Sequence, residues 1–289
     1  MAIAIKARLL LAASLFSCAS AQPVFDVASV KPNKSNNPPT FNFPLGPGDT
    51  YVANGGFLAA TNFPLGTYIA FAYKMQGSQM QSLMKQLPEW VMTDRFDIQA
   101  RAEGNPGKDQ MRLMMRALLA DRFKLAMHSE ARETSVFAFV LLKPGVTGPN
   151  LRPHPADSSC PDPASGTPLT IAGGFPALCG GLFPMAPSVA GRLRFGARNV
   201  TISFIANSLS AGSGIGRPMV DQTGLSGTFD FTIEFTPEDR RGSPPDAAAD
   251  NGGPTLVEAL REQLGIKLES RKSQVDMLVV DHVEHLIEN

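Results

Sequence analysis

Two stretches of this chain carry the same succession of apolar and polar patterns, one before residue 144 and one after residue 190. In the first stretch, alternating positions predict strands over residues 57–62 and 94–100, and an apolar run between them predicts a helix over 65–73. A hairpin that ends in the apolar strand 136–142 closes the stretch. A second helix precedes this hairpin, with apolar residues at the spacing of one buried face: Met111, Met114, Met115, Leu118 and Leu119.

The second stretch repeats this series. Strands are predicted over residues 193–199 and 227–235, with a helix over 202–209 between them, and the apolar strand 275–280 ends the stretch. A second helix again comes before the last strand, and its buried face consists of Leu256, Ala259, Leu260 and Leu264. Each half is therefore predicted to follow the order strand, helix, strand, helix, strand, strand.

The two halves also share residue identities. Both central strands contain a Phe-Asp pair, at residues 96–97 and 229–230, and this match supports an internal duplication. A helix that returns to a hairpin is typical of α+β proteins. The predicted fold class is α+β, with two related halves, mixed or antiparallel sheet and helices packed on one face.

Segments rich in Pro, Gly and Asn interrupt these patterns. Residues 31–49, 144–190 and 238–254 show neither helical nor strand periodicity, so they are predicted to be loops. The middle segment separates the halves. The predicted organisation is a signal peptide over 1–21, a first α+β half over 22–143, a Pro/Gly-rich loop over 144–190 and a second α+β half over 191–289.

Residues 1–21 have the pattern of a secretory signal peptide. Lys6 and Arg8 precede a short apolar core, and an Ala-x-Ala cleavage site ends at Ala21. The core is far shorter than the roughly 20 residues that cross a bilayer, and no later stretch comes close. The mature protein is therefore predicted to be soluble and exported, in the periplasm or outside the cell. A lipid anchor at Cys18 is an alternative, which the bulky Phe16 disfavours.

Charge selects no class of partner. The chain has 26 Lys+Arg and 26 Asp+Glu, and removal of residues 1–21 leaves 24 against 26, a net charge of −2. A balance of this kind gives no electrostatic reason to expect nucleic acid or an anionic membrane as a partner. An envelope protein or a small extracellular ligand remains open as the partner.

The cysteines agree with export. Cys18 leaves with the signal peptide, so Cys160 and Cys179 remain, and an isolated pair in an oxidising compartment is most simply a disulfide. Two free thiols or one catalytic cysteine would need a partner base, and the neighbouring sequence offers none.

Four side chains are candidates for chemistry or binding. Asp221 and Asp230 delimit a Gly-rich motif that is predicted to be a structured turn between two strands, and as a carboxylate pair they would suit acid/base catalysis in a cleft. His128 lies near Glu130 and Glu133 and is predicted to form a cross-strand pair. Trp90, the only tryptophan, is predicted to plug the junction between the first helix and the next strand; an exposed binding aromatic is the alternative.

No cofactor or metal is predicted. His282, Glu284 and His285 have the chemistry of a zinc or nickel site, but strand alternation sends positions i and i+3 to opposite faces, which favours surface histidines. The Gly-rich segment 212–216 follows a helix and precedes a strand, the reverse of the order in phosphate-binding loops.

Several specific stretches occur in a fixed order: FDVASVKP (25–32), LPEWV (87–91), FDIQA (96–100), LLADRFKL (118–125), VDQTGLSGTFDF (220–231) and VVDHVE (279–284). With them the chain resembles, over essentially the whole mature sequence, a large paralogous family of uncharacterised exported proteins of Solibacter-type soil Acidobacteria. A related domain in that family can also follow an antirepressor-type membrane metallopeptidase module, which implies an extracytoplasmic sensing or interaction role by analogy. The motif His-Glu-x-x-His of that peptidase is absent from this sequence. The resemblance thus implies a domain of unknown function, without catalytic residues to carry over.

Three hypotheses about function follow. The first is a non-catalytic extracytoplasmic binding or interaction module. The second is a secreted hydrolase that uses carboxylates near Asp221 and Asp230, and the third is a structural component of the envelope. A cleft that gathers Asp221, Asp230 and His128 would favour the enzyme, whereas an apolar surface or an open sheet edge would favour binding.

Overall fold

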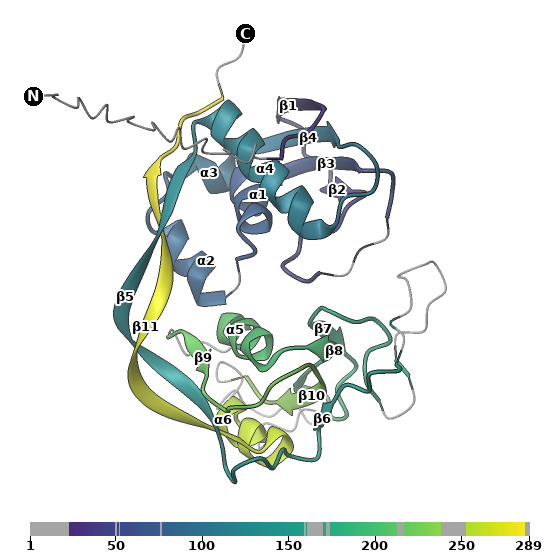
Figure 1. The fold of residues 1–289 in the computed structure, drawn as a ribbon, viewed down its shortest axis with the longest axis vertical. Helices are drawn as coiled ribbons and strands as arrows, with labels where there is room; N and C mark the ends of the chain where they lie inside the picture. The colour runs from purple at the N-terminus through teal and green to yellow at the C-terminus, as the bar shows by residue number, and fades with distance from the viewer. Residues whose placement is uncertain are drawn as a thin grey trace, which may run out of the picture.

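Two lobes joined by a long two-stranded ribbon make up the protein in a computed structural model (Figure 1). The structure describes residues 23–49, 51, 53–75, 77–158, 160, 170–171, 174–212, 217–237 and 253–286. The predicted signal peptide with Cys18, most of the Gly-rich segment 212–216 and most of the predicted loop 238–254 lie outside these residues. Within the described part, no helix combines the length and the apolar character that a membrane span requires.

The first lobe consists of a four-stranded antiparallel sheet covered by helices. Its strand order is β1 (Val27–Asn33), β4 (Arg95–Arg101), β3 (Phe57–Pro64) and β2 (Thr40–Phe41). The helices are α1 (Leu65–Ala72), α3 (Trp90–Thr93) and α4 (Lys108–Phe123). Tyr68 of α1 is fully buried and its hydroxyl donates to the carbonyl oxygens of Ala60 and Phe96, at 3.1 and 2.9 Å, which fastens the helix to the two central strands. The core between helices and sheet includes Leu58, Ile69, Phe71, Ile98, Met111, Met115, Leu119 and Phe123.

The second lobe has the same strand arrangement. Its sheet follows the order β6 (Leu151–Pro153), β10 (Phe229–Phe235), β8 (Leu193–Val200) and β7 (Phe183–Met185), with antiparallel neighbours throughout. The helices are α5 (Ile202–Gly212), α6 (Leu256–Ala259) and the π-helical turn η2 (Leu260–Leu264). A capping box begins α6, because Thr255 and Glu258 bond each other's backbone amides at 3.1 and 2.7 Å. Its core includes Ile205, Leu209, Phe231, Ile233, Leu256, Leu260 and Leu264.

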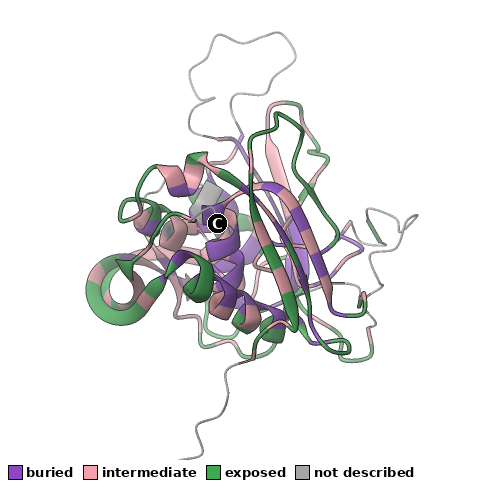
Figure 2. Cartoon of the chain, turned by 90° about the horizontal axis from the view of Figure 1, so that it is seen from above, coloured by how far each residue is buried: buried purple, intermediate pink, exposed green. Residues whose placement is uncertain are grey.

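The ribbon exchanges strands between the lobes. Strand β5 (Ala126–Leu141) leaves the first lobe after α4 and ends in the core of the second, where Phe139 and Leu141 are buried. Strand β11 (Ile266–His282) runs the opposite way, and Leu278 and Val280 pack against the first core. The two strands pair antiparallel along nearly their whole length, and β9 (Met219–Asp221) adds to β5 in parallel. Figure 2 shows buried positions gathered inside the lobes and exposed positions at the periphery.

The α+β fold class is confirmed, but the ribbon differs from the predicted hairpins. Each half ends in a single strand of 16 or 17 residues that pairs with the strand of the other half. Between His128 and Ser135 nearly every residue of β5 is exposed. Apolar and polar positions therefore do not alternate there, and the sequence gives no strand signal. The predicted loops also contain strands, since β2, β6 and β7 lie within the segments 31–49 and 144–190.

Candidate functional site

Cavities lie between the two lobes, where helix α2 (Gly77–Met84) of the first lobe packs against α5 of the second. One cavity of about 490 Å³ exposes polar and apolar surface in about equal parts, and most of its lining residues are polar, including Asp49, Lys74, Gln79, Asn199, Ser203 and Asn207. A second, of about 500 Å³, is mainly apolar and is lined by Met75, Met80, Leu182, Phe183 and Phe204, among others. Gly180 and Phe204 line both cavities, so a polar and an apolar compartment adjoin each other in one cleft.

A loop of the first lobe touches the second lobe at the edge of this cleft. A Cβ added to Gly48 would overlap the carbonyl oxygen of Gly180, so only glycine allows this close approach of the two backbones. Arg112 of α4, which is 2% exposed, holds the loop by donating to the carbonyl oxygens of Pro47 and Gly48, both at 2.9 Å, and to Asp49 at 2.7 Å. The contact between the lobes is therefore fixed by a buried guanidinium.

Charged groups beside this loop have shifted pKa values. Burial alone would raise the pKa of Asp49, but hydrogen bonds from Lys74 and Arg112 outweigh it, so the pKa lies below its ordinary value. The Lys108 amine donates to the carbonyl oxygen of Gly48 and lines the apolar cavity. Burial, together with the nearby Arg112 charge, lowers the pKa of Lys108 to about 8. The cleft thus contains one ammonium group that is easily neutralised.

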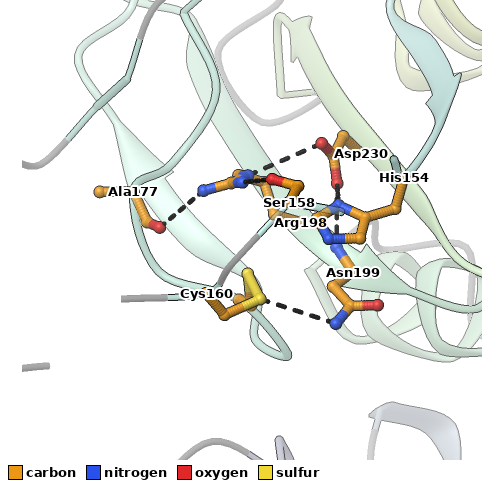
Figure 3. Close-up of a disulfide and its surroundings, with 8 residues drawn as sticks. His154, Ser158, Cys160, Ala177, Arg198, Asn199 and Asp230 are labelled. Atoms are coloured by element: carbon orange, nitrogen blue, oxygen red, sulfur yellow. Dashed lines mark hydrogen bonds and ion pairs between the residues drawn. A yellow bond between two sulfur atoms is a disulfide. The ribbon is translucent and has the colours of Figure 1, made fainter. Parts of the chain in front are cut away.

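A buried polar cluster lies in the second lobe beside the disulfide (Figure 3). Asp230 bonds the His154 Nδ1 atom at 2.6 Å, accepts from the Asn199 backbone amide at 3.0 Å and lies 3.6 Å from the Arg198 guanidinium. Arg198 also donates to the Ala177 carbonyl oxygen and to the Ser158 hydroxyl, both at 2.9 Å. The cluster ties β6, β8 and β10 to the segment that carries the cysteines.

The predicted disulfide is present. Cys160 and Cys179 are bonded, with Cα atoms 5.6 Å apart, and the Asn199 amide lies 3.6 Å from the Cys160 sulfur. A ring nitrogen of His154 and the two sulfur atoms all lie within 4.8 Å of one another, the one group of potential metal ligands in the described part of the chain. The sulfurs are bonded to each other, so in this oxidation state they are not free to act as thiolate ligands.

Asp221 and Asp230 have separate partners. The Asp221 carboxylate accepts from the amide and hydroxyl of Thr223, at 2.9 and 2.8 Å, and Gly224 and Gly227 adopt positive φ. The predicted structured turn after β9 is thereby confirmed. Asp230 belongs to the buried cluster with His154, and no hydrogen bond between described residues joins the two carboxylates.

The other candidates lie away from the cleft. His128 bonds Asp281 across the ribbon at 2.9 Å, which confirms the predicted cross-strand pair. Trp90 is half-buried against the first core, with its ring 4.5 Å from that of His285 and 6.5 Å from that of Phe123. His285 in turn bonds Asp94 at 2.7 Å, whereas His282 bonds Glu284 at 2.8 Å. Both histidine side chains are more than half exposed, which confirms the prediction of surface histidines.

The residues that form the cleft and the buried polar cluster were not identified from the sequence. His154 lies in the segment 144–190 that was predicted to be a loop, and its partner Asp230 is 76 residues away. Lys74 and Lys108 come from different elements and meet the cleft only through the fold. One signal was present: Lys31-Pro-Asn33 and Arg152-Pro-His154 are similar tripeptides, and both pair with the Phe-Asp strands.

Fold and site together define a two-lobed α+β protein with ligand-sized cavities between its lobes. The chain belongs to the family described as protein of unknown function DUF3738, whose model matches residues 66–283. This match spans the second lobe, both strands of the ribbon and the part of the first lobe that follows β3. No curated protein and no solved structure matches the chain.

Proposed function

We propose that this protein is a non-catalytic extracytoplasmic binding module that holds a small amphipathic molecule between its lobes. The observation that carries the proposal is the pair of adjoining cavities, each about 500 Å³, one lined mostly by polar residues and one mainly apolar. Ligand pockets commonly have volumes of roughly 300–1,000 Å³ and lie between lobes or domains. A ligand with an apolar body and a polar end would match the two compartments.

Side chains of both lobes would contact such a ligand. Met75 and Met80 come from the first lobe, and Leu182 and Phe204 come from the second. Methionine side chains are flexible and polarizable, so they adapt to differently shaped apolar groups. The Lys108 amine at the edge of the apolar cavity suits an anionic or strongly hydrogen-bonding group at the ligand's polar end.

The proposed location outside the cytoplasm rests on two observations. The N-terminal pattern of residues 1–21 is typical of a secretory signal peptide. The Cys160–Cys179 disulfide is of a kind that persists mainly in oxidising compartments. The alternative of a secreted hydrolase would need Asp221 and Asp230 to act together, and each carboxylate has structural partners of its own.

Calorimetric titration with 8-anilinonaphthalene-1-sulfonate, an amphipathic anion, tests the proposal. We expect saturable binding of one probe molecule, weakened at least tenfold in Met80→Trp and in Leu182→Trp, which enlarge one lining side chain from each lobe. Met84→Trp, on an exposed position of the same helix as Met80, is the matched control and retains binding. Equal affinity in the wild type and in all three variants would place the probe elsewhere and contradict the proposal.

A further inference from the structure

His154 of the second lobe lies beside the disulfide and has a buried ring nitrogen that bonds no described residue. It is a histidine with a 6% exposed side chain, and its Nδ1 atom is occupied by Asp230. Its Nε2 atom is buried and has no hydrogen-bond partner among the described residues. Buried polar atoms are nearly always satisfied in folded proteins, so an unsatisfied one in a native structure calls for a functional explanation.

The disulfide is the feature beside this nitrogen. A ring nitrogen of His154 and both sulfur atoms lie within 4.8 Å of one another, and Asp230 leaves Nε2 as the nitrogen that can serve the sulfurs. A disulfide sulfur cannot donate a hydrogen bond, whereas a thiol donates to an imidazole nitrogen and a thiolate accepts from an imidazolium. Reduction would therefore give Nε2 the partner that it lacks in the oxidised state.

Other donors near the cysteines favour the same state. The Asn199 side-chain amide lies 3.6 Å from the Cys160 sulfur, and the Arg198 guanidinium donates to the carbonyl oxygen of Ala177, two residues before Cys179. Positive or proton-donating groups beside a cysteine stabilise its thiolate, which is the reactive form in thiol–disulfide exchange. The carboxylate of Asp230 fixes the orientation of the imidazole, as an aspartate does in a Cys–His–Asp arrangement.

We propose that Cys160–Cys179 is a reversibly reducible disulfide, with His154 as the group that transfers protons to and from its sulfurs. The reductant is a dithiol. One of its thiols gives its proton to His154 Nε2, and the resulting thiolate attacks the sulfur of Cys160, which is more exposed than Cys179. The Cys160–Cys179 bond breaks, its electron pair goes to the Cys179 sulfur, and His154 returns the proton there.

The second thiol of the reductant completes the exchange. It attacks the other sulfur of the reductant, which is bonded to Cys160 in the mixed disulfide. Cys160 is released as a thiol, and the reductant becomes a disulfide. Two electrons and two protons pass to the protein in total. Cys179 lines the apolar cavity and Asn199 lines the other one, so the change between disulfide and thiols takes place at the wall of the cleft. The exchange chemistry itself does not depend on any ligand in that cleft.

The test compares the wild type with His154→Asn in buffers of reduced and oxidised dithiothreitol at pH 7, with free thiols counted by mass spectrometry after alkylation. Asparagine is the residue that the first lobe has at this place, where Asn33 bonds Asp97, so the variant keeps a hydrogen-bonding side chain toward Asp230. We expect the equilibrium constant for reduction to fall about tenfold, equivalent to roughly 30 mV. His128→Asn, on the exposed ribbon, is the control and leaves the constant unchanged.

A second measurement needs no variant. In the folded wild type, despite its partly buried position, the disulfide is expected to react with dithiothreitol at least tenfold faster than in the same protein unfolded in urea. Circular dichroism of the reduced protein should show the folded spectrum. The proposal is overturned if folded and unfolded protein react at equal rates, if reduction unfolds the protein, or if His154→Asn and the wild type have the same equilibrium constant.

Discussion

The two lobes share one structural device and differ in what surrounds it. In each lobe the inner strand beside the central one, β3 or β8, has a bulge that contains an asparagine with positive φ, Asn62 or Asn199. The aspartate of the Phe-Asp pair accepts from the backbone amide of that asparagine, at 2.8 Å for Asp97 and 3.0 Å for Asp230. The bulge and its carboxylate therefore belong to the fold that both lobes have in common.

The surroundings of the carboxylate separate the lobes. Asp97 accepts its second hydrogen bond from the neutral side-chain amide of Asn33, at 2.7 Å. At the same place Asp230 bonds His154, and the buried Arg198 occupies the bulge position that Thr61 has in the first lobe. The histidine, the arginine and the disulfide occur in the second lobe alone among the described residues, which indicates that they serve more than the shared fold.

The largest effect is expected when the carboxylate charge is removed from each lobe. Asp230→Asn leaves the Arg198 charge buried without a counter-ion and should lower the free energy of unfolding by about 3–5 kcal/mol. Asp97→Asn keeps an acceptor for two neutral donors and should cost only about 1 kcal/mol. Urea unfolding of both variants at pH 7 measures the difference. Equal losses would mean that the two carboxylates have the same role.

A smaller effect concerns the helix that follows the central strand. Its first residue is the buried Lys108 in α4 and the buried Leu256 in α6. The folded protein loses the Lys108 proton at about pH 8, whereas the unfolded chain holds it to its ordinary pKa of 10.5. The unfolded state therefore binds more protons at Lys108 in this interval, and the contribution of this residue to stability rises with pH from about 8 to about 10.5, by up to about 3 kcal/mol.

Lys108→Met makes the first lobe resemble the second at this position. The variant should lack the increase in the free energy of unfolding with pH that Lys108 contributes. Its stability relative to the wild type is therefore greatest near neutral pH and declines as the pH approaches 10.5. Denaturant unfolding at half-unit pH steps, with the exposed Lys124→Met as control, measures this contribution. A difference between wild type and Lys108→Met that does not vary with pH would show that the amine is not neutralised by burial.

Much of the shared fold could be predicted from the sequence, because it depends on local patterns. Helices α1, α4 and α5 have apolar residues at helical spacing, and β4 and β10 alternate around the Phe-Asp pair, so their positions were predicted within a few residues. The disulfide followed from the number of cysteines and the expected compartment.

The remaining features depend on contacts between distant segments. Strands β6 and β7 have three residues each and lie among prolines and glycines, so only their pairing with β10 and β8 makes them strands. The polar centre of β5 is stabilised by β11, more than 130 residues later for most pairs. His154 becomes a candidate site residue only when the fold places it beside Asp230 and the cysteines.

The smallest effect tests whether the two bulges are equivalent. A non-glycine residue other than asparagine or aspartate in the left-handed region costs about 1–2 kcal/mol, so Asn62→Ala and Asn199→Ala should each lower the free energy of unfolding by about that amount. Asn62→Gly and Asn199→Gly keep the backbone conformation accessible and should cost less than the alanine variants. If the bulge has the same role in both lobes, the free energy of unfolding differs between the alanine and the glycine variant by the same amount at both positions. Both variants lack the side-chain contacts of the asparagine, so the different contacts of Asn62 and Asn199 cancel in this comparison. Urea unfolding of the four variants measures it, and a difference confined to one lobe would show that only that lobe needs the left-handed residue.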